Sequence, residues 1–314
     1  MQLIKEYINN SGYNIGEMIQ YSQTLIDKFI REPLKISINI PRKALFEKII
    51  QDIKSLGFIL DFPDMPDFDN NFIKAIQRID GGDRRNGGII KVNKKLDCLA
   101  KAEGILHEYI HLKLPIIPIL TTDKESNYYW IDSKPYNLTI TELLVEFCFL
   151  NLWLPKDNLL NELKSKEYNI DEFIKSYKGV KLSTLLQWIA LICPFTCHFA
   201  WVVIPKDGNN YFLPDICDKF RYTHNPINKL EDFQFDVILR NPNSIAARAL
   251  AARESRSGIS TLNNTSYRCY AYYERDKSRS RSNAFFPGIN SENYDQLIVI
   301  GWNEDDYLNF MQNT

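Results

Sequence analysis

The sequence lacks several features that would place it in a large class of proteins. Its 38 Lys and Arg are balanced by 39 Asp and Glu, so no overall charge attracts nucleic acid or an anionic membrane. Its 6 Cys have neither the density nor the spacing of a disulfide framework, which favours a reducing compartment. The first residues, MQLIKE, show no signal-peptide pattern. We therefore expect a cytoplasmic protein whose 314 residues, 45% of them hydrophobic, suffice for one large core or a few smaller ones.

Long apolar runs are also scarce, and the one run with the length of a membrane span is interrupted by polar residues and a proline. Residues 185–204 are mostly apolar, but they include Gln187 and His198, and Pro194 divides them. Proline ends a helix, and the β-branched residues that follow are typical of a strand. We therefore expect a helix before Pro194 and a strand over 199–204, and no membrane partner.

Clusters with the spacing of a structural zinc site are not evident either. Cys193, Cys197 and His198 stand close together, but no partner cluster follows at zinc spacing. Free cysteine is commonly a small buried apolar residue. We therefore expect these three side chains in the core.

Histidine is scarce, with 4 in the chain, yet two of them stand in one motif. Positions 107–111 have the sequence HEYIH, which matches the pattern H-E-x-x-H. Residues four apart on a helix share a face, so His107 and His111 can bind one metal ion. Glu108 can then hold the water bound to that metal. The motif predicts a zinc-dependent hydrolase.

The residues around the motif predict the helix that it needs. GIIKVN at 88–93 is short and β-branched, which is typical of a strand. From about Leu96, apolar residues recur at three- and four-residue steps, which is typical of a helix, and Pro115 ends it. Glu103 lies one turn before His107 on the same face, where it could support the site, but we favour a solvated carboxylate at the start of the helix.

A catalytic zinc site needs a third protein ligand and an open position for water. Glu142 and Glu146 stand four apart in an apolar helical run that ends at Pro155, so both point the same way. A carboxylate in such a helix is costly to bury unless it is paired or binds metal. We predict Glu142 as the ligand and Glu146 as a residue that orients a ligating histidine through a hydrogen bond. The spacing also allows the reverse assignment.

The chain before the motif is predicted to begin with two helices and to continue with a strand. An apolar stripe at helical spacing covers 15–30. A second helix over 41–56 opens with Pro41 and closes before Gly57, and 58–62 has the composition of a strand.

Two helices joined by a tight turn follow Pro155, at 170–177 and 182–192, with the spacing of a helix-turn-helix. The second of them is apolar all round, so we favour a structural role over DNA recognition. Strands are predicted at 268–273 and 296–302, with Asn303 as the N-cap of a last helix.

The segment 240–281 is basic, with nine Lys and Arg against three acidic residues. Ser244 is predicted to cap an Ala-rich helix that runs through Arg256. Arginine suits phosphate and carboxylate ligands, so an anionic or nucleic-acid signal is a possible partner. We favour the simpler interpretation, a solvated surface.

These pieces, in this order, resemble the ImmA/IrrE family of zinc metallopeptidases, as a divergent member. The strand at 88–93, the H-E-x-x-H helix and the step from Glu142 to Pro155 match the family pattern, and that step favours Glu142 as the ligand. Ile110 stands where the family usually has Gly, and Val145 and Glu146 stand where it favours Ala and Asn.

The resemblance implies an α+β protein with a zincin-like metallopeptidase domain at 1–155. A helix-turn-helix-like segment at 156–195 and a small α/β sensor-like domain at 196–314 would follow. It implies Zn²⁺ held by His107, His111 and Glu142, with Glu108 as the catalytic residue. It also implies a regulatory cut in a helix-turn-helix repressor, in response to a stress or mobile-element signal.

Two further hypotheses concern substrate and transition state. The strand at 89–93 could pair with an extended substrate through an exposed edge. An oxyanion donor is also needed, and the candidates are Tyr128, Tyr129, His198 and His224, although core packing is favoured for His198 and an exposed loop for His224. The competing functions are a non-catalytic regulator that keeps the metal and a nucleic-acid or anion-binding protein that uses 240–281.

Overall fold

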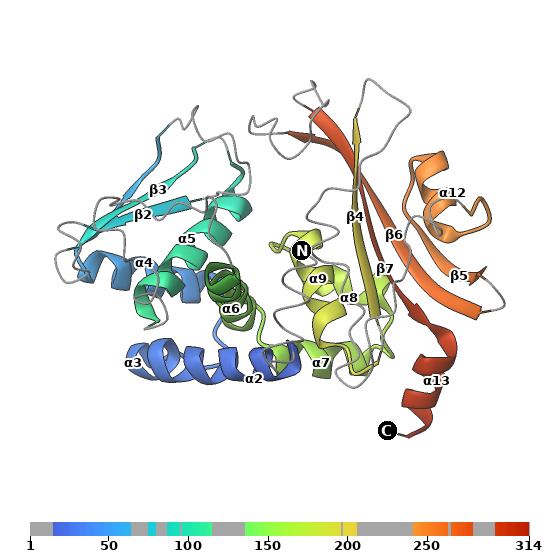
Figure 1. Ribbon diagram of the computed structural model, residues 1–314, viewed down its shortest axis with the longest axis horizontal. Helices are drawn as coiled ribbons and strands as arrows, with labels where there is room; N and C mark the ends of the chain where they lie inside the picture. Colours follow the sequence, from blue (N-terminus) through green and yellow to red (C-terminus); the bar gives the residue numbers. More distant parts are fainter. Residues whose placement is uncertain are drawn as a thin grey trace. The chain divides into compact units, whose positions relative to one another are not determined.

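The computed structural model is an α+β protein with two compact units, which meet along the sequence between Asn158 and Leu159 (Figure 1). Each unit has its own sheet. The segments predicted separately at 156–195 and 196–314 fall almost entirely in the second unit. The structure describes residues 15–63, 75–79, 87–94, 96–114, 136–195, 197–205, 241–262, 265–278 and 293–313.

The first unit begins with a long helical stretch. Helix α2 (Ile15–Ile26) continues through a π turn, η1 (Asp27–Arg31), into the short α3 (Glu32–Leu34). The helix predicted over 15–30 is therefore present, with a π turn that periodicity did not indicate. Helix α4 (Arg42–Ser55) follows Pro41, as predicted.

The sheet of the first unit has the order β1-β3-β2. Strand β1 (Phe58–Asp61) runs parallel to β3 (Gly88–Val92), and β2 (Ala75–Ile79) runs antiparallel to it. The strands predicted at 58–62 and 88–93 are confirmed. The predicted exposed edge at 89–93 is wrong, because β3 is the central strand and pairs on both sides.

Helices α5 (Cys98–Lys113) and α6 (Tyr136–Trp153) carry the candidate site residues. Asp97 caps α5, since its Oδ1 accepts a hydrogen bond of 2.8 Å from the Ala100 N–H. The helix ends before Pro115, as predicted. α5 packs against α4, α6 and the strands β2 and β3, and α6 also packs against α2.

Helices precede the sheet of the second unit. Helix α7 (Lys156–Ser165) crosses the boundary between the units, and α8 (Ile170–Phe173) continues as a 3₁₀ turn, η5 (Ile174–Ser176). Helix α9 (Leu182–Ile192) completes the predicted helical pair. Most of α9 is buried, so it is not an exposed recognition helix and the structural interpretation is confirmed. Its buried side chains are Leu185, Leu186, Trp188, Ile189, Ala190, Leu191 and Ile192.

The second sheet has the order β4-β7-β6-β5, with every neighbouring pair antiparallel. Its strands are β4 (Cys197–Pro205), β5 (Arg256–Leu262), β6 (Thr265–Ser278) and β7 (Asn293–Asn303). Helix α12 (Ile245–Ala252) covers one face, and α9 lies on the other (Figure 1).

The caps predicted in the second unit are present. The Oγ of Ser244 accepts a hydrogen bond of 3.0 Å from the Ala247 N–H, and the Oδ1 of Asn303 accepts one of 2.8 Å from the Asp305 N–H at the start of α13 (Glu304–Gln312). The helix predicted through Arg256 is wrong at its end. α12 stops at Ala252, because Arg253 has a left-handed backbone with φ 55° and the chain then turns into β5.

The apolar run at 185–204 divides as predicted. α9 ends before Pro194, and β4 begins at Cys197. Cys193, Cys197 and His198 are buried, which confirms their place in the core. None of the helices in the described ranges is long and apolar enough to cross a membrane.

Two glycines allow β1 and β3 to begin side by side. Gly57 and Gly87 have φ values of +80° and +79°, which cost other residues about 1–2 kcal/mol each. A Cβ added at Gly87 would overlap the carbonyl group of Gly57, whereas a Cβ at Gly57 would touch only Gly87, at 3.4 Å.

Gly87→Ala should therefore lower the free energy of unfolding by about 2–4 kcal/mol, since it adds overpacking to backbone strain. Gly57→Ala is the matched control and should lower it by about 1–2 kcal/mol, from strain alone. Urea unfolding measures both. Equal losses would show that the close approach of the two backbones does not constrain the start of β3.

His198 should make stability depend on pH, because burial lowers its pKa from 6.5 to about 3. As pH falls below 6.5, the unfolded chain takes up a proton at this residue and the folded protein does not, so stability is lost. From about pH 7 to about pH 5 the loss from this group is about 2 kcal/mol. His198→Leu should lose that much less than the wild type over the same interval in urea unfolding. Equal losses in the two proteins would contradict this.

Candidate metal centre

The two histidines of the motif face each other across one turn of α5. The Nε2 atoms of His107 and His111 are 3.2 Å apart, and their ring centroids are 4.9 Å apart. Two nitrogens bound to one tetrahedral zinc at 2.0–2.1 Å would lie about 3.3 Å apart. The pair therefore has the spacing of two zinc ligands. In the metal-free protein the same spacing accommodates one N–H···N hydrogen bond between the rings.

A carboxylate from α6 stands behind one of these rings. The Oε2 of Glu146 lies 3.3 Å from the Nδ1 of His107, and both side chains are partly exposed. An ionised carboxylate can only accept hydrogen bonds. In the neutral ring of His107, Nδ1 therefore carries the hydrogen and Nε2 keeps its lone pair. Nε2 is the atom that faces His111. This is the contact that a residue orienting a ligating histidine needs.

Glu142 belongs to α6 one turn before Glu146, but its side chain lies outside those that the structure describes. Among the described side chains, which exclude Glu142, no three His, Cys, Asp or Glu form a metal-binding group. The assignment of Glu142 as third ligand stays a prediction.

The acidic residues of α5 are both buried. Glu108, one residue after the first histidine, is 9% exposed, and Glu103 is 2% exposed. The solvated carboxylate predicted at Glu103 is wrong. Asp97 starts the helix at Cys98, so Glu103 lies in its second turn, where the packing around α5 covers it.

A polar contact that the sequence did not indicate fixes α5 against α4. Tyr109 is fully buried, and its hydroxyl donates a hydrogen bond of 2.6 Å to the Oδ2 of Asp52. The Nζ of Lys113 lies 2.9 Å from the same oxygen. Burial and the bond to Asp52 raise the pKa of Tyr109 far above its usual value, so the hydroxyl stays a donor. Tyr109 is one of the variable positions of the motif, so the pattern gave no signal for this role.

The assignment of an oxyanion donor stays a prediction. Tyr128, Tyr129 and His224 lie outside the described residues. His198 lies in β4, in the sheet of the second unit, and its burial agrees with core packing.

Three of the arginines described in the basic segment, Arg256, Arg268 and Arg275, form contacts within the second unit. Arg268 forms two hydrogen bonds, of 2.5 and 2.9 Å, with the carboxylate of Glu304. Arg256 lies 3.6 Å from Glu254, and Arg275 donates to the backbone carbonyl of Arg253 at 3.1 Å. For these three arginines, the contacts favour an internal role over binding of an anion. Arg240, Arg279 and Arg281 lie outside the described residues.

Tyr109→Phe should lower the free energy of unfolding by about 1.5–3 kcal/mol, because a buried hydrogen bond to a charged group is lost. Tyr21→Phe is the control in the same unit, since Tyr21 is 55% exposed, and it should change stability by less than about 0.5 kcal/mol. Urea unfolding measures both. Similar values for the two variants would show that the Asp52 contact does not hold α5.

Comparisons with known proteins bear on the fold. No protein-family model and no curated protein matches the sequence. A solved structure described as a Mycobacterium tuberculosis transcriptional regulator is similar, with a TM-score of 0.56 over 96% of this chain and 79% of that chain. The two sequences are 14% identical, so the likeness concerns the fold alone.

Proposed function

We propose that this protein is a zinc-dependent endopeptidase. The observation that carries the proposal is the pair of Nε2 atoms 3.2 Å apart on His107 and His111, with Glu146 behind the first ring. These two histidines would hold zinc, and Glu142 is the predicted third ligand. When bound, zinc would polarise the scissile carbonyl and lower the pKa of its water to about 7.

Glu108 is the proposed general base and acid. It follows His107 directly on α5 and is buried, so it would lie beside the water of a metal held by the two histidines. It would accept a proton from the attacking water and return it to the leaving amine nitrogen. Glu146 would keep His107 in the tautomer whose Nε2 lone pair points at the site.

The proposed substrate is a helix-turn-helix transcriptional repressor, cut once in response to a stress or mobile-element signal. The likeness of the motif and its spacing to the ImmA/IrrE family supports this substrate class. A protein of similar fold is called a transcriptional regulator, which agrees with a role in gene control. The second unit, a sheet covered by helices on both faces, is the proposed sensor.

Glu108→Gln should keep zinc and lose cleavage of a helix-turn-helix repressor encoded beside this protein by at least about 10²-fold, because the proton acceptor is gone. His107→Ala should lose zinc as well as cleavage. Metal analysis of the purified proteins and a gel assay of the repressor measure the two properties.

The outcomes separate the competing functions. A wild type that binds one zinc per chain but cuts no repressor would indicate a non-catalytic regulator and overturn the peptidase proposal. A wild type without zinc affinity would overturn the metal centre, and the anion-binding function of 240–281 would then be the one to test. Cleavage by Glu108→Gln at the wild-type rate would remove Glu108 from the mechanism.

A further inference from the structure

In the part of helix α6 whose side chains the structure describes, 144–153, no single apolar face defines the rotation of the helix. Its second half is buried almost without interruption, so apolar side chains point in every direction around the axis. The buried apolar area alone therefore does not select one rotation of this helix. The buried side chains are Leu144, Val145, Phe147, Cys148, Phe149, Leu150, Asn151, Leu152 and Trp153. The contact between Glu146 and His107 nevertheless needs one particular rotation.

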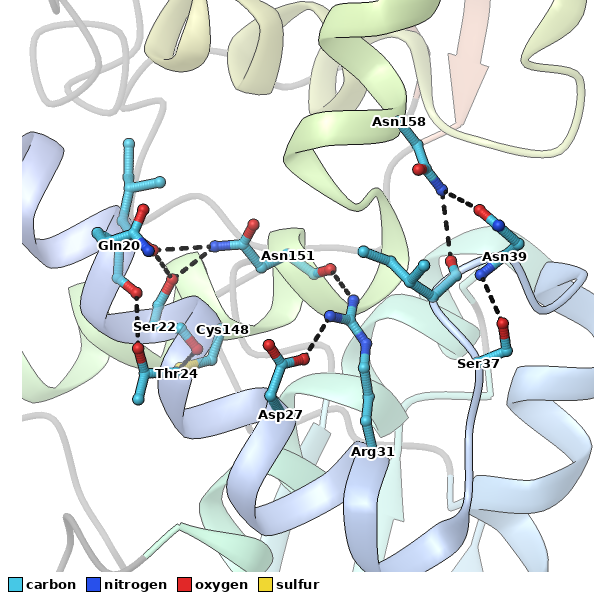
Figure 2. A network of polar contacts seen from close by, with 12 residues as sticks. Gln20, Ser22, Thr24, Asp27, Arg31, Ser37, Asn39, Cys148, Asn151 and Asn158 are labelled. Carbon is cyan, nitrogen blue, oxygen red and sulfur yellow. Dashed lines mark hydrogen bonds and ion pairs between the residues drawn. The ribbon is translucent and has the colours of Figure 1, made fainter.

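A polar residue on another side of α6 favours one rotation of the helix. Asn151 is 1% exposed, and its Nδ2 donates to the Oγ of Ser22 at 2.6 Å and to the carbonyl of Ile19 at 3.2 Å, both on α2 (Figure 2). Asn151 stands five positions after Glu146, which places the two residues about 140° apart around the helix. Because this buried amide must reach hydrogen-bond partners at fixed positions on α2, α6 can adopt few other rotations about its axis.

An arginine fixes the same residue along the helix axis. The carbonyl of Asn151 would accept from the N–H four residues later, but that residue is Pro155, which has none. Arg31 replaces it, since its Nη2 donates to this carbonyl at 2.8 Å while its Nη1 donates to the Oδ1 of Asp27 at 2.7 Å (Figure 2). Arg31 is itself buried. Its charge also complements the negative end of the α6 dipole.

We propose that Asn151 and Arg31 are positioning residues for the metal centre. Together they set the rotation and the axial position of α6, and so hold Glu146 against His107. The inference rests on the proposed zinc site and adds to it the residues on which its orienting carboxylate depends.

Asn151→Leu tests the rotation, because leucine has a similar size and no polar partner to seek. Ser22 keeps its own hydrogen bond of 2.7 Å to the Ile19 carbonyl. Competition with a chelator should show zinc affinity weakened about tenfold, the lower range for loss of a group that orients a ligand. Arg31→Met should weaken it similarly, and Arg31→Lys should restore part of the loss, since an ammonium can still donate to the carbonyl.

Asn158→Leu is the matched control. Asn158 lies on α7, and its Nδ2 donates to the Oδ1 of Asn39 at 2.9 Å and to the Ile38 carbonyl at 3.4 Å, so the same atoms are removed without touching α6. Zinc affinity should stay within about twofold of the wild type. An equal loss in Asn151→Leu and Asn158→Leu would overturn the inference, because it would reflect general destabilisation.

A double mutant distinguishes positioning from a merely structural role. In the Glu146→Ala background, Asn151→Leu should weaken zinc binding no further, since the contact that Asn151 sets up is already gone. An additive loss would mean that Asn151 acts on the site by another route, and would sink the proposal.

A measurement on the metal-free protein separates this inference from the proposed function. The Nδ1–H proton of His107, bonded to Glu146, should be protected from exchange with water in NMR spectra of the wild type and of Asn158→Leu. It should lose that protection in Asn151→Leu. If this holds while zinc does not bind, the zinc function fails and the positioning role stands. If protection is the same in all three proteins, the positioning role fails even where zinc binds.

Discussion

The contact between Glu146 and His107 is the interaction on which the rest of the candidate centre depends. It joins α5 and α6, and it selects the ring nitrogen of His107 that faces His111. The contact, with 3.3 Å between Oε2 and Nδ1, needs a matching rotation and axial position of α5 and α6. Much of the packing in the first unit therefore serves to fix the rotation and position of α5 and α6.

Each of the two helices is held by polar groups from a different neighbour. Asp52 on α4 receives Tyr109 and Lys113 from α5. The Nδ2 of Asn151 on α6 donates hydrogen bonds to a backbone carbonyl and to the Ser22 hydroxyl on α2. Arg31 donates a hydrogen bond to the backbone carbonyl of Asn151. Such groups are costly to bury without partners, so each helix has one placement in which every partner is present. Apolar packing supplies most of the stability of the unit, and these contacts select its geometry.

Much of the fold was predictable because local sequence patterns determine its helices and strands. The helix of the motif, the strand before it and the cap at Asn303 follow from periodicity, proline positions and capping chemistry. What failed depends on contacts distant in sequence. The central place of β3 depends on its pairing with both β1 and β2, which its own sequence does not specify. Within the site, the paired histidines were predictable from spacing, whereas Asp52 and Asn151 act across 57 and 129 residues.

The π turn at Asp27–Arg31 has a consequence for how this chain compares with relatives in evolution. A π turn holds one more residue than the α-helical turn that it replaces. Loss of a single residue there would restore a regular helix and turn the remaining residues of this helical stretch, Arg31 included, by about 100° relative to α2. Ser22 would keep its place beside Asn151, while Arg31 would move away from the carbonyl it caps. In this stretch, a one-residue gap in an alignment therefore marks a change in how α6 is held, not a neutral difference in length.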